Sequence, residues 1–491
     1  MSWHVKVIAN RYADSVKLMG IARALRAEDG VTGCEMGMGT QANLELLASR
    51  GVEAQAGPSD LIVAVQADDD DVAADTLAKA EDALSSGGSD SSSGGTAERE
   101  QPRSLVSARR RLEDANVALI SVAGEYATLE AHRALSAGMH VFLFSDHVSL
   151  DDELALKRRG HELGLLVMGP GCGTAMLGHV GLGFANVVTA GPVGIVAAAG
   201  TGAQESACLL DAAGVGVSQI VGVGGRDLSA EIGGIMFRQA MRMLAEDDAT
   251  ETLLLVSKSP APEVVRSLGD DLPDGKRVSA AFVGWDGGEA PFEIHDTLEA
   301  AARAAAGTAP ADLSELEAAV DAARERSAGR KLLGLFSGGS LAHEAVTLLE
   351  PELGPLEGNI GHGPDERNGG HAVLDLGEEE YTQGRPHPMV DLDVRLGFLD
   401  EAARDDGVGC ILLDVVLGHG GHSDPATGLS DAIARAARNA VVLARVCGTA
   451  GDPQDAGRQT KILREAGAIV APSNAAATRL ALRAIADPVA A

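Results

Sequence analysis

The chain has 491 residues, 45% of them hydrophobic, and its 71 acidic residues outnumber 40 basic ones to give a formal net charge of −31 at pH 7. The length and apolar content predict several domains with buried cores, and the negative charge would repel a phosphate backbone, so we expect no nucleic-acid partner. Five cysteines without a CxxC pair indicate neither a disulfide framework nor a zinc knuckle, which favours a reducing cytoplasm.

The N-terminal segment predicts a small domain followed by a linker. Residues 1–84 alternate short apolar runs, such as HVKVIA and LIVAVQA, with helix-like segments, which predicts a small N-terminal α/β module. Charges interrupt its first apolar run, so no secretory signal is indicated. The Ser/Gly-rich residues 85–104 lack the apolar side chains that a folded segment buries, and they predict a linker.

A second α/β domain is expected at residues 105–188. Its apolar runs VALISVA, HVFLFS and GLLVMGP are separated by helical patterns, which predicts a parallel, Rossmann-like βαβαβ arrangement. Residues 164–204 contain no Asp, Glu, Lys or Arg, but glycines and two prolines interrupt this stretch. We therefore expect buried strands joined by glycine turns, and no membrane partner.

The sequence of the rest of the chain predicts that one α/β unit is duplicated. Two α/β units are expected at residues 189–308 and 330–491, joined by a helical connector at residues 309–329. GIVAAAGTGAQESACLLDAAG in the first unit matches GLFSGGSLAHEAVTLLEPELG in the second. Each copy then keeps the order strand, glycine turn, helix, strand, acidic loop, long helix, acidic turn and strand. Agreement over about a hundred residues is more specific than any single loop.

The duplicated glycine turn is a candidate anion site. A glycine turn between a buried strand and a helix leaves the first N–H groups of the helix unpaired at its positive end, which suits a phosphate or a carboxylate. If the copies pair with pseudo-symmetry, both helix ends could point at one anion. The alternative is that small residues only let each helix pack on its strand. The predicted phosphate- or substrate-binding residues are Gly200, Thr201, Gly202 and Gln204 in the first copy, and Gly338, Gly339, Ser340 and His343 in the second.

Several motifs carry a family resemblance. GLLVMGPGCGTAML followed by GPVGIVAAAGTGAQES resembles the α-subunit of succinyl-CoA synthetase, and VALISVAGEYATLEAHRAL resembles the CoA-binding domain of that subunit. The second copy, with GRPHPMVD and VCGTAGDPQ, and the start NRYADSVKLM resemble the FdrA family of succinyl-CoA synthetase-like proteins. The resemblance implies an α/β chain in which a CoA-binding-type Rossmann domain precedes two repeated flavodoxin-like domains of the succinyl-CoA synthetase type.

The departures from the synthetases bear on the chemistry. In those enzymes two helix N-termini hold a phosphorylated histidine that lies in a GHAGA loop. Here His295 has similar spacing but leads directly into a helix, and VSKSPA at residues 256–261 replaces the glutamate-bearing GEIGG. We therefore expect His295 to be a helix-entry residue, and we do not expect the chain alone to make an acyl-CoA at the expense of ATP.

The FdrA resemblance implies a function. Some members form, with two other subunits, an oxamate carbamoyltransferase of allantoin and purine breakdown, in which phosphate attacks oxalurate to give carbamoyl phosphate and oxamate. We expect a subunit of such an oligomeric complex, with phosphate as a substrate, CoA as a possible ligand of residues 105–185, and no other cofactor. Two alternatives stay open: a component of an NDP-forming acyl-CoA synthetase, and a non-catalytic scaffold that binds a metabolite.

Carbamoyl transfer also needs donors for the developing oxyanion and a clamp for the carboxylate of the substrate. The loops GHGPDERNGGHA and GRPHPMVD of the last domain offer side chains for the clamp, although both could be solvated loops between domains. HGGHSD, with His419 and His422, is expected to be a polar loop rather than a metal site. The predicted catalytic residues are His362, Arg367, Asn368, Arg385 and His387.

Overall fold

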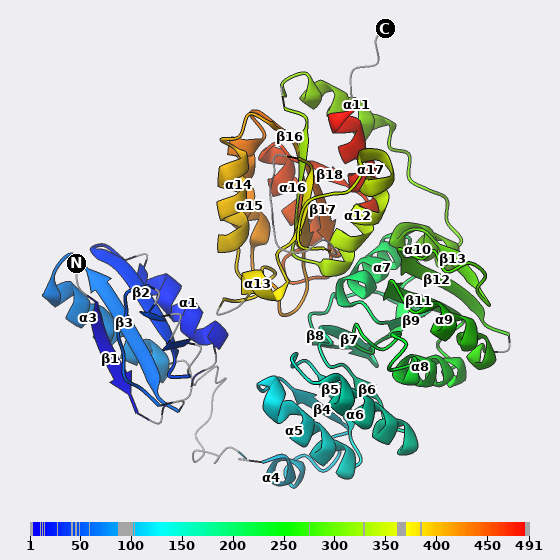
Figure 1. The fold of residues 1–491 in the computed structure, drawn as a ribbon, viewed down its shortest axis with the longest axis horizontal. Helices are drawn as coiled ribbons and strands as arrows, with labels where there is room; N and C mark the ends of the chain where they lie inside the picture. Colours follow the sequence, from blue (N-terminus) through cyan, green and yellow to red (C-terminus); the bar gives the residue numbers. More distant parts are fainter. Residues whose placement is uncertain are drawn as a thin grey trace. The chain divides into compact units, whose positions relative to one another are not determined.

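The structure is a computed structural model, which describes the chain except residues 1–2, 10, 12, 14, 27, 41–42, 45–46, 49, 58, 87–101, 103, 274, 328, 361–369, 383–384 and 487–491. The chain divides into two compact units (Figure 1). The first comprises Met1–Gln101 with Thr382–Pro386, and the second comprises Pro102–Tyr381 with His387–Ala491. Most of the predicted linker lies outside the described residues. No described helix combines the length and apolar character needed to cross a membrane.

The first unit contains an antiparallel sheet of order β1-β3-β2. Its elements include β1 (His4–Ile8), α1 (Ser15–Arg26), β2 (Val31–Met38), β3 (Leu61–Ala67) and α3 (Asp70–Ser86). Both helices pack on one face of the sheet, around Cys34 and Val63. A smaller cluster around Ile62 and Ala64 covers the other face. Burial on both faces explains why β3 is a continuous apolar run.

The second unit begins with a parallel sheet of order β4-β5-β6. Its elements are α4 (Leu105–Arg109), β4 (Val117–Ile120), α5 (Gly124–Ser136), β5 (His140–Leu143), α6 (Leu150–Glu162) and β6 (Val167–Met168). Helix α6 starts after Ser149, whose hydroxyl accepts the N–H of Asp152, an N-cap that stabilises the first turn. This is the βαβαβ order expected from the sequence.

A seven-stranded sheet of order β13-β12-β11-β9-β10-β7-β8 follows. Its parallel strands are β9 (Ala190–Ala197), β10 (Val217–Gly222), β11 (Thr252–Lys258), β12 (Arg277–Val283) and β13 (Glu293–His295). The hairpin of β7 (Thr174–Leu177) and β8 (Val180–Gly183) adds an antiparallel edge next to β10. Its helical segments are α7 (Gly200–Ala212), α8 (Ile235–Glu246), α9 (Pro262–Ser267), η1 (Leu268–Asp271) and α10 (Leu298–Ala306). Helices α7 and α10 cover one face, and α8 and α9 cover the other.

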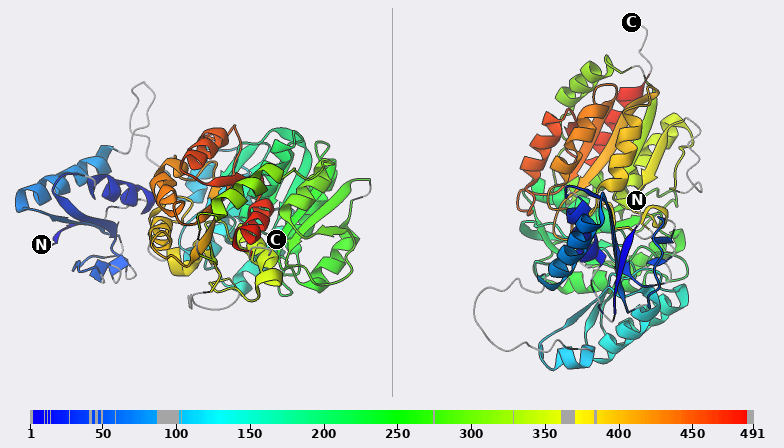
Figure 2. Two further views of the ribbon diagram at one scale, coloured as in Figure 1. Left: turned by 90° about the horizontal axis from the view of Figure 1, so that it is seen from above. Right: turned by 90° about the vertical axis from the view of Figure 1, so that its left-hand side faces the viewer.

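The last sheet has five parallel strands in the order β15-β14-β16-β17-β18. The strands are β14 (Lys331–Phe336), β15 (Ala372–Asp375), β16 (Val408–Val416), β17 (Val441–Cys447) and β18 (Ile469–Ala471). The helices of this part are α11 (Ser314–Arg324), α12 (Gly339–Leu353), α13 (Glu379–Thr382), α14 (Asp393–Ala402), α15 (Pro425–Ala436), α16 (Ala456–Glu465) and α17 (Asn474–Ile485). Helices α11, α12 and α17 cover one face, and α14, α15 and α16 cover the other (yellow to red in Figures 1 and 2).

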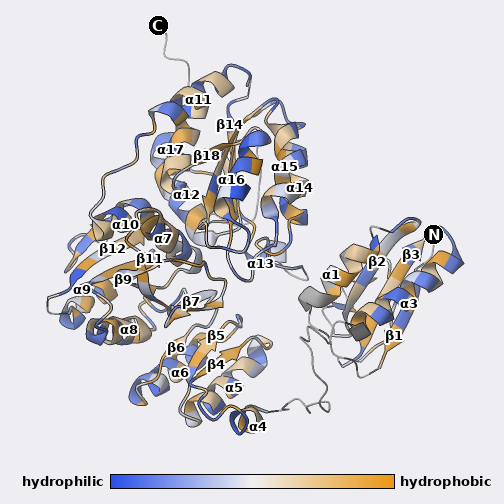
Figure 3. Cartoon of the chain, turned by 180° about the vertical axis from the view of Figure 1, so that it is seen from behind, coloured by the Kyte–Doolittle hydropathy of each residue, from blue (hydrophilic) through white to orange (hydrophobic). Residues whose placement is uncertain are grey.

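The two sheets confirm the predicted duplication and the flavodoxin-like fold. The order β10-β9-β11-β12-β13 of the first copy equals the order β15-β14-β16-β17-β18 of the second, and both are the 2-1-3-4-5 order of flavodoxin-like domains. Apolar strands lie between helices that expose their polar faces (Figure 3). The first helices, α7 and α12, and the last helices, α10 and α17, share one apolar core between the two sheets. In this arrangement each copy packs its corresponding helices against the other copy.

Candidate anion site between the two copies

The N-termini of α7 and α12 meet in the second unit. The N–H of Ser340 donates to the hydroxyl of Thr201, with 3.2 Å between nitrogen and oxygen. A Cβ placed on Gly338 would lie 2.9 Å from the methyl group of Thr201, so only glycine permits this approach. Each helix follows the first strand of a flavodoxin-like sheet, which is where such folds bind ligands. The structure thus brings together the two helix ends that we expected to meet if the two copies pair with pseudo-symmetry.

Four N–H groups at this junction remain available to a ligand. Within the described part of the chain, the N–H groups of Gly200, Thr201, Gly202 and Gly339 donate to no protein atom. The other two predicted donors of the second copy are engaged: Gly338 donates to Asp414 and Ser340 donates to Thr201. First-turn N–H groups without acceptors carry the positive end of the helix dipole, so the junction attracts negative charge.

A carboxylate of the protein already accepts hydrogen bonds from the N–H groups just before α12. Asp414, in β16, is fully buried and accepts the N–H groups of Ser337 and Gly338 at 2.8 Å each, together with the Ser337 hydroxyl. The buried guanidinium of Arg395, on α14, bonds to the same carboxylate at 2.9 Å. This network fixes the turn before α12, because every acceptor on the buried charge has a donor.

Lys258 is a positive charge at the junction that the sequence analysis did not single out. It ends β11 and is half-buried, and none of the ion pairs or hydrogen bonds described for the chain uses its ammonium group. A Cβ placed on Gly339 would lie 3.5 Å from its Nζ. An ammonium group that pairs with no carboxylate of the described residues, beside free N–H groups, supplies the charge that a phosphate requires.

His387 lies on the same side of the second copy. Its Nδ1 accepts the N–H of Met389, so a neutral ring carries its proton on Nε2. Burial, together with the charge of Arg395, lowers the pKa of His387 to about 4, so the ring is neutral at physiological pH. A Cβ placed on Gly377 would lie 2.7 Å from Nε2 of His387 and 3.1 Å from a carboxylate oxygen of Asp375. His387 is therefore a donor near this edge, and its role as a substrate clamp stays a prediction.

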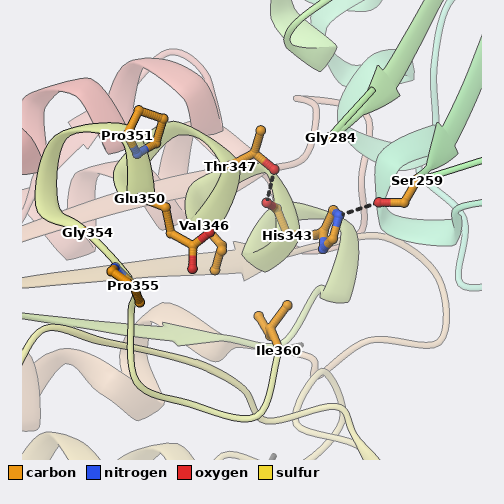
Figure 4. Close-up of a pocket in the computed structure, with 10 residues that line it drawn as sticks. All are labelled: Ser259, Gly284, His343, Val346, Thr347, Glu350, Pro351, Gly354, Pro355 and Ile360. Carbon is orange, nitrogen blue, oxygen red and sulfur yellow. Dashed lines mark hydrogen bonds between the residues drawn. The ribbon is translucent and has the colours of Figure 1, made fainter. Parts of the chain in front are cut away.

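A cavity of about 610 Å³ opens beside α12 (Figure 4). His343 points toward Ser259, and the imidazole Nε2 and the serine hydroxyl lie 3.0 Å apart. Burial and the charge of Lys258 lower the pKa of His343. The lining residues are Ser259, Gly284, His343, Val346, Thr347, Glu350, Pro351, Gly354, Pro355 and Ile360. The cavity therefore combines neutral hydrogen-bonding groups, a carboxylate and apolar contacts.

The remaining predicted site residues are not gathered at the junction. Gln204 is buried and donates to Asn186 at 3.0 Å, so its amide belongs to the packing of the copies. Arg385 is exposed and belongs to the first unit. His295 lies in β13, two residues before the N-cap of α10, as expected for a helix-entry residue. His362, Arg367 and Asn368 lie outside the described residues.

Comparison with known proteins gives two family matches. The CoA-ligase family matches residues 335–484, and the family described as AllF, heavy metal-associated domain, matches residues 1–102. Among the described residues no cluster of His, Cys, Asp or Glu could hold a metal ion. Cys34, the single cysteine of residues 1–102, is fully buried, and burial raises its pKa to about 11. The described residues of this segment do not fit a heavy-metal site.

One relative covers nearly the whole chain, and others cover parts of it. An uncharacterized protein of Escherichia coli, YahF, is 36% identical over 96% of this chain and 97% of its own length. Subunit alpha 2 of the ADP-forming succinate–CoA ligase of Archaeoglobus fulgidus is 30% identical over 43% of this chain and 78% of its own length. The crystal structure of PH0766 from Pyrococcus horikoshii aligns with a TM-score of 0.29 and 15% identity, over 75% of this chain and 83% of that one.

Proposed function

The chain belongs to the family of Escherichia coli YahF and the α-subunits of succinate–CoA ligases, and from that premise we propose that it is the phosphate-binding subunit of a carbamoyl-transferring complex. In the proposed reaction phosphate takes the carbamoyl group of oxalurate, which gives carbamoyl phosphate and oxamate in the breakdown of purines and allantoin. The setting is cytoplasmic, and two other subunits complete the enzyme.

The convergence of α7 and α12 carries the proposal. Their free N–H groups at Thr201 and Gly339 and the ammonium group of Lys258 form a preorganised positive site. A tetrahedral dianion makes several hydrogen bonds at once, and donors fixed by two helices need little reorganisation to supply them. The phosphohistidine loop expected in a succinyl-CoA synthetase is replaced by a strand that leads straight into α10, which favours free phosphate as the anion.

The donor substrate would occupy the cavity beside His343. Its carbamoyl and amide groups offer N–H donors and carbonyl acceptors, which suit the neutral His343, the Ser259 hydroxyl and the Glu350 carboxylate. His387 remains the proposed clamp for the carboxylate of the oxamate group. The match of residues 1–102 to the AllF domain supports assignment to the allantoin pathway.

A second candidate is a component of an NDP-forming acyl-CoA synthetase. The observations that favour it are the CoA-ligase match at residues 335–484 and the parallel β4-β5-β6 domain, which would bind CoA. Both candidates use the same junction for an oxyanion and differ in the acyl acceptor. A purely structural scaffold is the third possibility.

Reconstitution with the two partner subunits separates these functions. We expect oxamate release from oxalurate that depends on phosphate. Hydroxamate formation that depends on nucleotide and CoA, without oxamate release, would instead support the synthetase. Full activity of the complex after Gly200→Asp combined with Gly339→Asp would support the scaffold, because a carboxylate at either helix end repels the anion.

A further inference from the structure

Asp375 is a buried residue to which the family resemblance gives no role. It ends β15, next to β14 in the second copy, and only 4% of its surface is exposed. One carboxylate oxygen, Oδ1, accepts the N–H of Gly377 at 2.9 Å. Among the described residues, the other oxygen, Oδ2, has no hydrogen-bond partner. Oδ2 is not one of the fully buried side-chain oxygens that lack a partner, so it is an acceptor that solvent or a ligand at the junction can reach.

The free oxygen faces the helix junction. A Cβ placed on Gly339 would lie 2.4 Å from Oδ2 of Asp375 and 3.5 Å from Nζ of Lys258. The carboxylate of Asp375 and the ammonium group of Lys258 therefore both lie close to the first residue of α12, and they form no ion pair with each other among the described residues. A glycine at this position leaves room for the Asp375 carboxylate beside the first turn of α12, so a ligand that accepts the Gly339 N–H would meet both groups.

We propose that Asp375 is the acid–base residue of this site, which protonates the leaving nitrogen of the carbamoyl donor and takes back a proton from the attacking phosphate. This inference rests on the proposed function. It adds a residue and a chemical step that neither the sequence nor the relatives assign.

The step is balanced in atoms and electrons. An oxygen of hydrogen phosphate forms a bond to the carbamoyl carbon, and the bond from that carbon to the oxamate nitrogen breaks, leaving its electron pair on nitrogen. Protonated Asp375 gives its proton to that nitrogen. The phosphate then gives its own proton to the Asp375 carboxylate, so the residue returns to its starting form and no oxidant or reductant takes part.

The surroundings of Asp375 favour this role. Burial raises its pKa to about 6, and the Gly377 N–H and the charge of Lys258 oppose that rise. The other charged groups that act on it are Glu378, which follows β15, and Asp414 on β16, and the neutral ring of His387 lies nearby. A residue that titrates not far below neutral pH can both give up and take back a proton during the reaction, and the phosphate proton becomes acidic once its oxygen bonds to the carbamoyl carbon. Dianionic phosphate placed beside the residue will favour its protonated form further.

Proton uptake on phosphate binding tests, in the full-length chain, whether Asp375 becomes protonated when phosphate binds. Calorimetric titration with inorganic phosphate in buffers of different ionisation enthalpy counts the protons exchanged. Near pH 7.5 we expect the wild-type chain to take up about one proton more per phosphate than Asp375→Asn, because the ionisation of phosphate itself contributes equally to both. Asp393→Asn, which removes an exposed carboxylate at the start of α14, is the matched control and should behave as wild type.

Turnover of the reconstituted complex tests the chemical step. Asp375→Asn should lower kcat for oxamate release by about 10²- to 10⁴-fold without weakening phosphate binding, because the neutral amide needs no proton before the dianion binds. Unchanged kcat, or unchanged proton uptake, in Asp375→Asn would overturn the inference. Proton uptake through Asp375 in a complex that releases no oxamate would contradict the proposed carbamoyl donor and leave the coupling of Asp375 to phosphate established.

Discussion

Glu205 and Glu344 occupy the same position in the two copies, and each caps the last helix of the other copy. Each is the sixth residue of its helix, α7 or α12. Glu205 accepts the N–H of Asn474, which begins α17, at 3.0 Å, and Glu344 accepts the N–H of Leu298, which begins α10, at 2.7 Å. A carboxylate at a helix N-terminus is stabilising. These two reciprocal helix caps hold the copies in the orientation in which Thr201 contacts Ser340.

Loss of the Glu205 carboxylate should weaken this joint strongly. Glu205 also pairs with Arg445, which is mostly buried, at 2.9 Å. Glu205→Gln leaves the guanidinium without its counter-charge, so we expect a loss of about 3–5 kcal/mol in the free energy of unfolding. Glu205→Gln combined with Arg445→Gln should cost less, because no charge is left unpaired. Urea unfolding followed by circular dichroism measures both; equal losses would show that the charge pairing does not matter.

Glu344 should make stability depend on pH. Burial raises its pKa to about 7 from an ordinary value of 4.5, against the hydrogen bonds from Asn474 and Leu298. The folded state then binds more protons than the unfolded state between these values, so this group favours folding most below pH 4.5 and loses about 3 kcal/mol as pH rises to 7. Glu344→Gln should remove that slope. Unfolding curves at a series of pH values check this, and identical slopes for the two proteins would refute it.

The buried pair of Asp414 and Arg395 should matter far more than a surface pair. Asp414→Asn removes the charge that neutralises Arg395 and holds the turn before α12, so we expect a loss of about 3–5 kcal/mol in unfolding free energy. The control is Asp400→Asn, which breaks the exposed pair between α14 and Arg435 and should cost about 0–1 kcal/mol. Thermal unfolding of the two variants side by side measures the contrast, which would vanish if Arg395 were stabilised by other groups.

Gly339 should be needed for ligand binding rather than for folding. In Gly339→Ala the new methyl group would displace the carboxylate of Asp375, which lies 2.4 Å from the Cβ position. We expect at least a tenfold weaker Kd for phosphate, roughly 1.4 kcal/mol, with a folded chain. Gly397→Ala, on α14, meets no atom within 4 Å and serves as the control. Titration calorimetry would contradict this account if both variants bound phosphate as the wild type does.

The sequence predicted the duplication well because each copy repeats the whole order of strand, glycine turn and helix. From that repeat we expected that, if the copies pair with pseudo-symmetry, the helix ends that contain Thr201 and Ser340 point at one anion, but not that these two residues bond to each other. The repeat also placed Gln204 at the site, whereas the structure buries its amide against Asn186. The side chain of the corresponding residue, His343, faces a cavity instead, and no sequence pattern distinguishes these two surroundings.

Lys258 and Asp375 could not be assigned from the sequence for a physical reason. Both end parallel strands, β11 and β15, and several other strand ends carry polar residues. Only the packing of the two copies decides which strand ends face the junction. The useful signal was the lysine of VSKSPA at a position where the synthetases have an acidic motif, because a change of charge sign at a strand end indicates a different ligand.

Equilibrium binding of inorganic phosphate to the full-length chain tests the central claim most directly. Lys258→Met removes the ammonium group at the junction, and Lys461→Met, at a side chain that is 76% exposed on α16, is the control. We predict that wild type and Lys461→Met bind phosphate alike and that Lys258→Met binds it at least about tenfold more weakly. Absence of phosphate binding by the wild type, or equal binding by Lys258→Met, would contradict an anion site between the two helices.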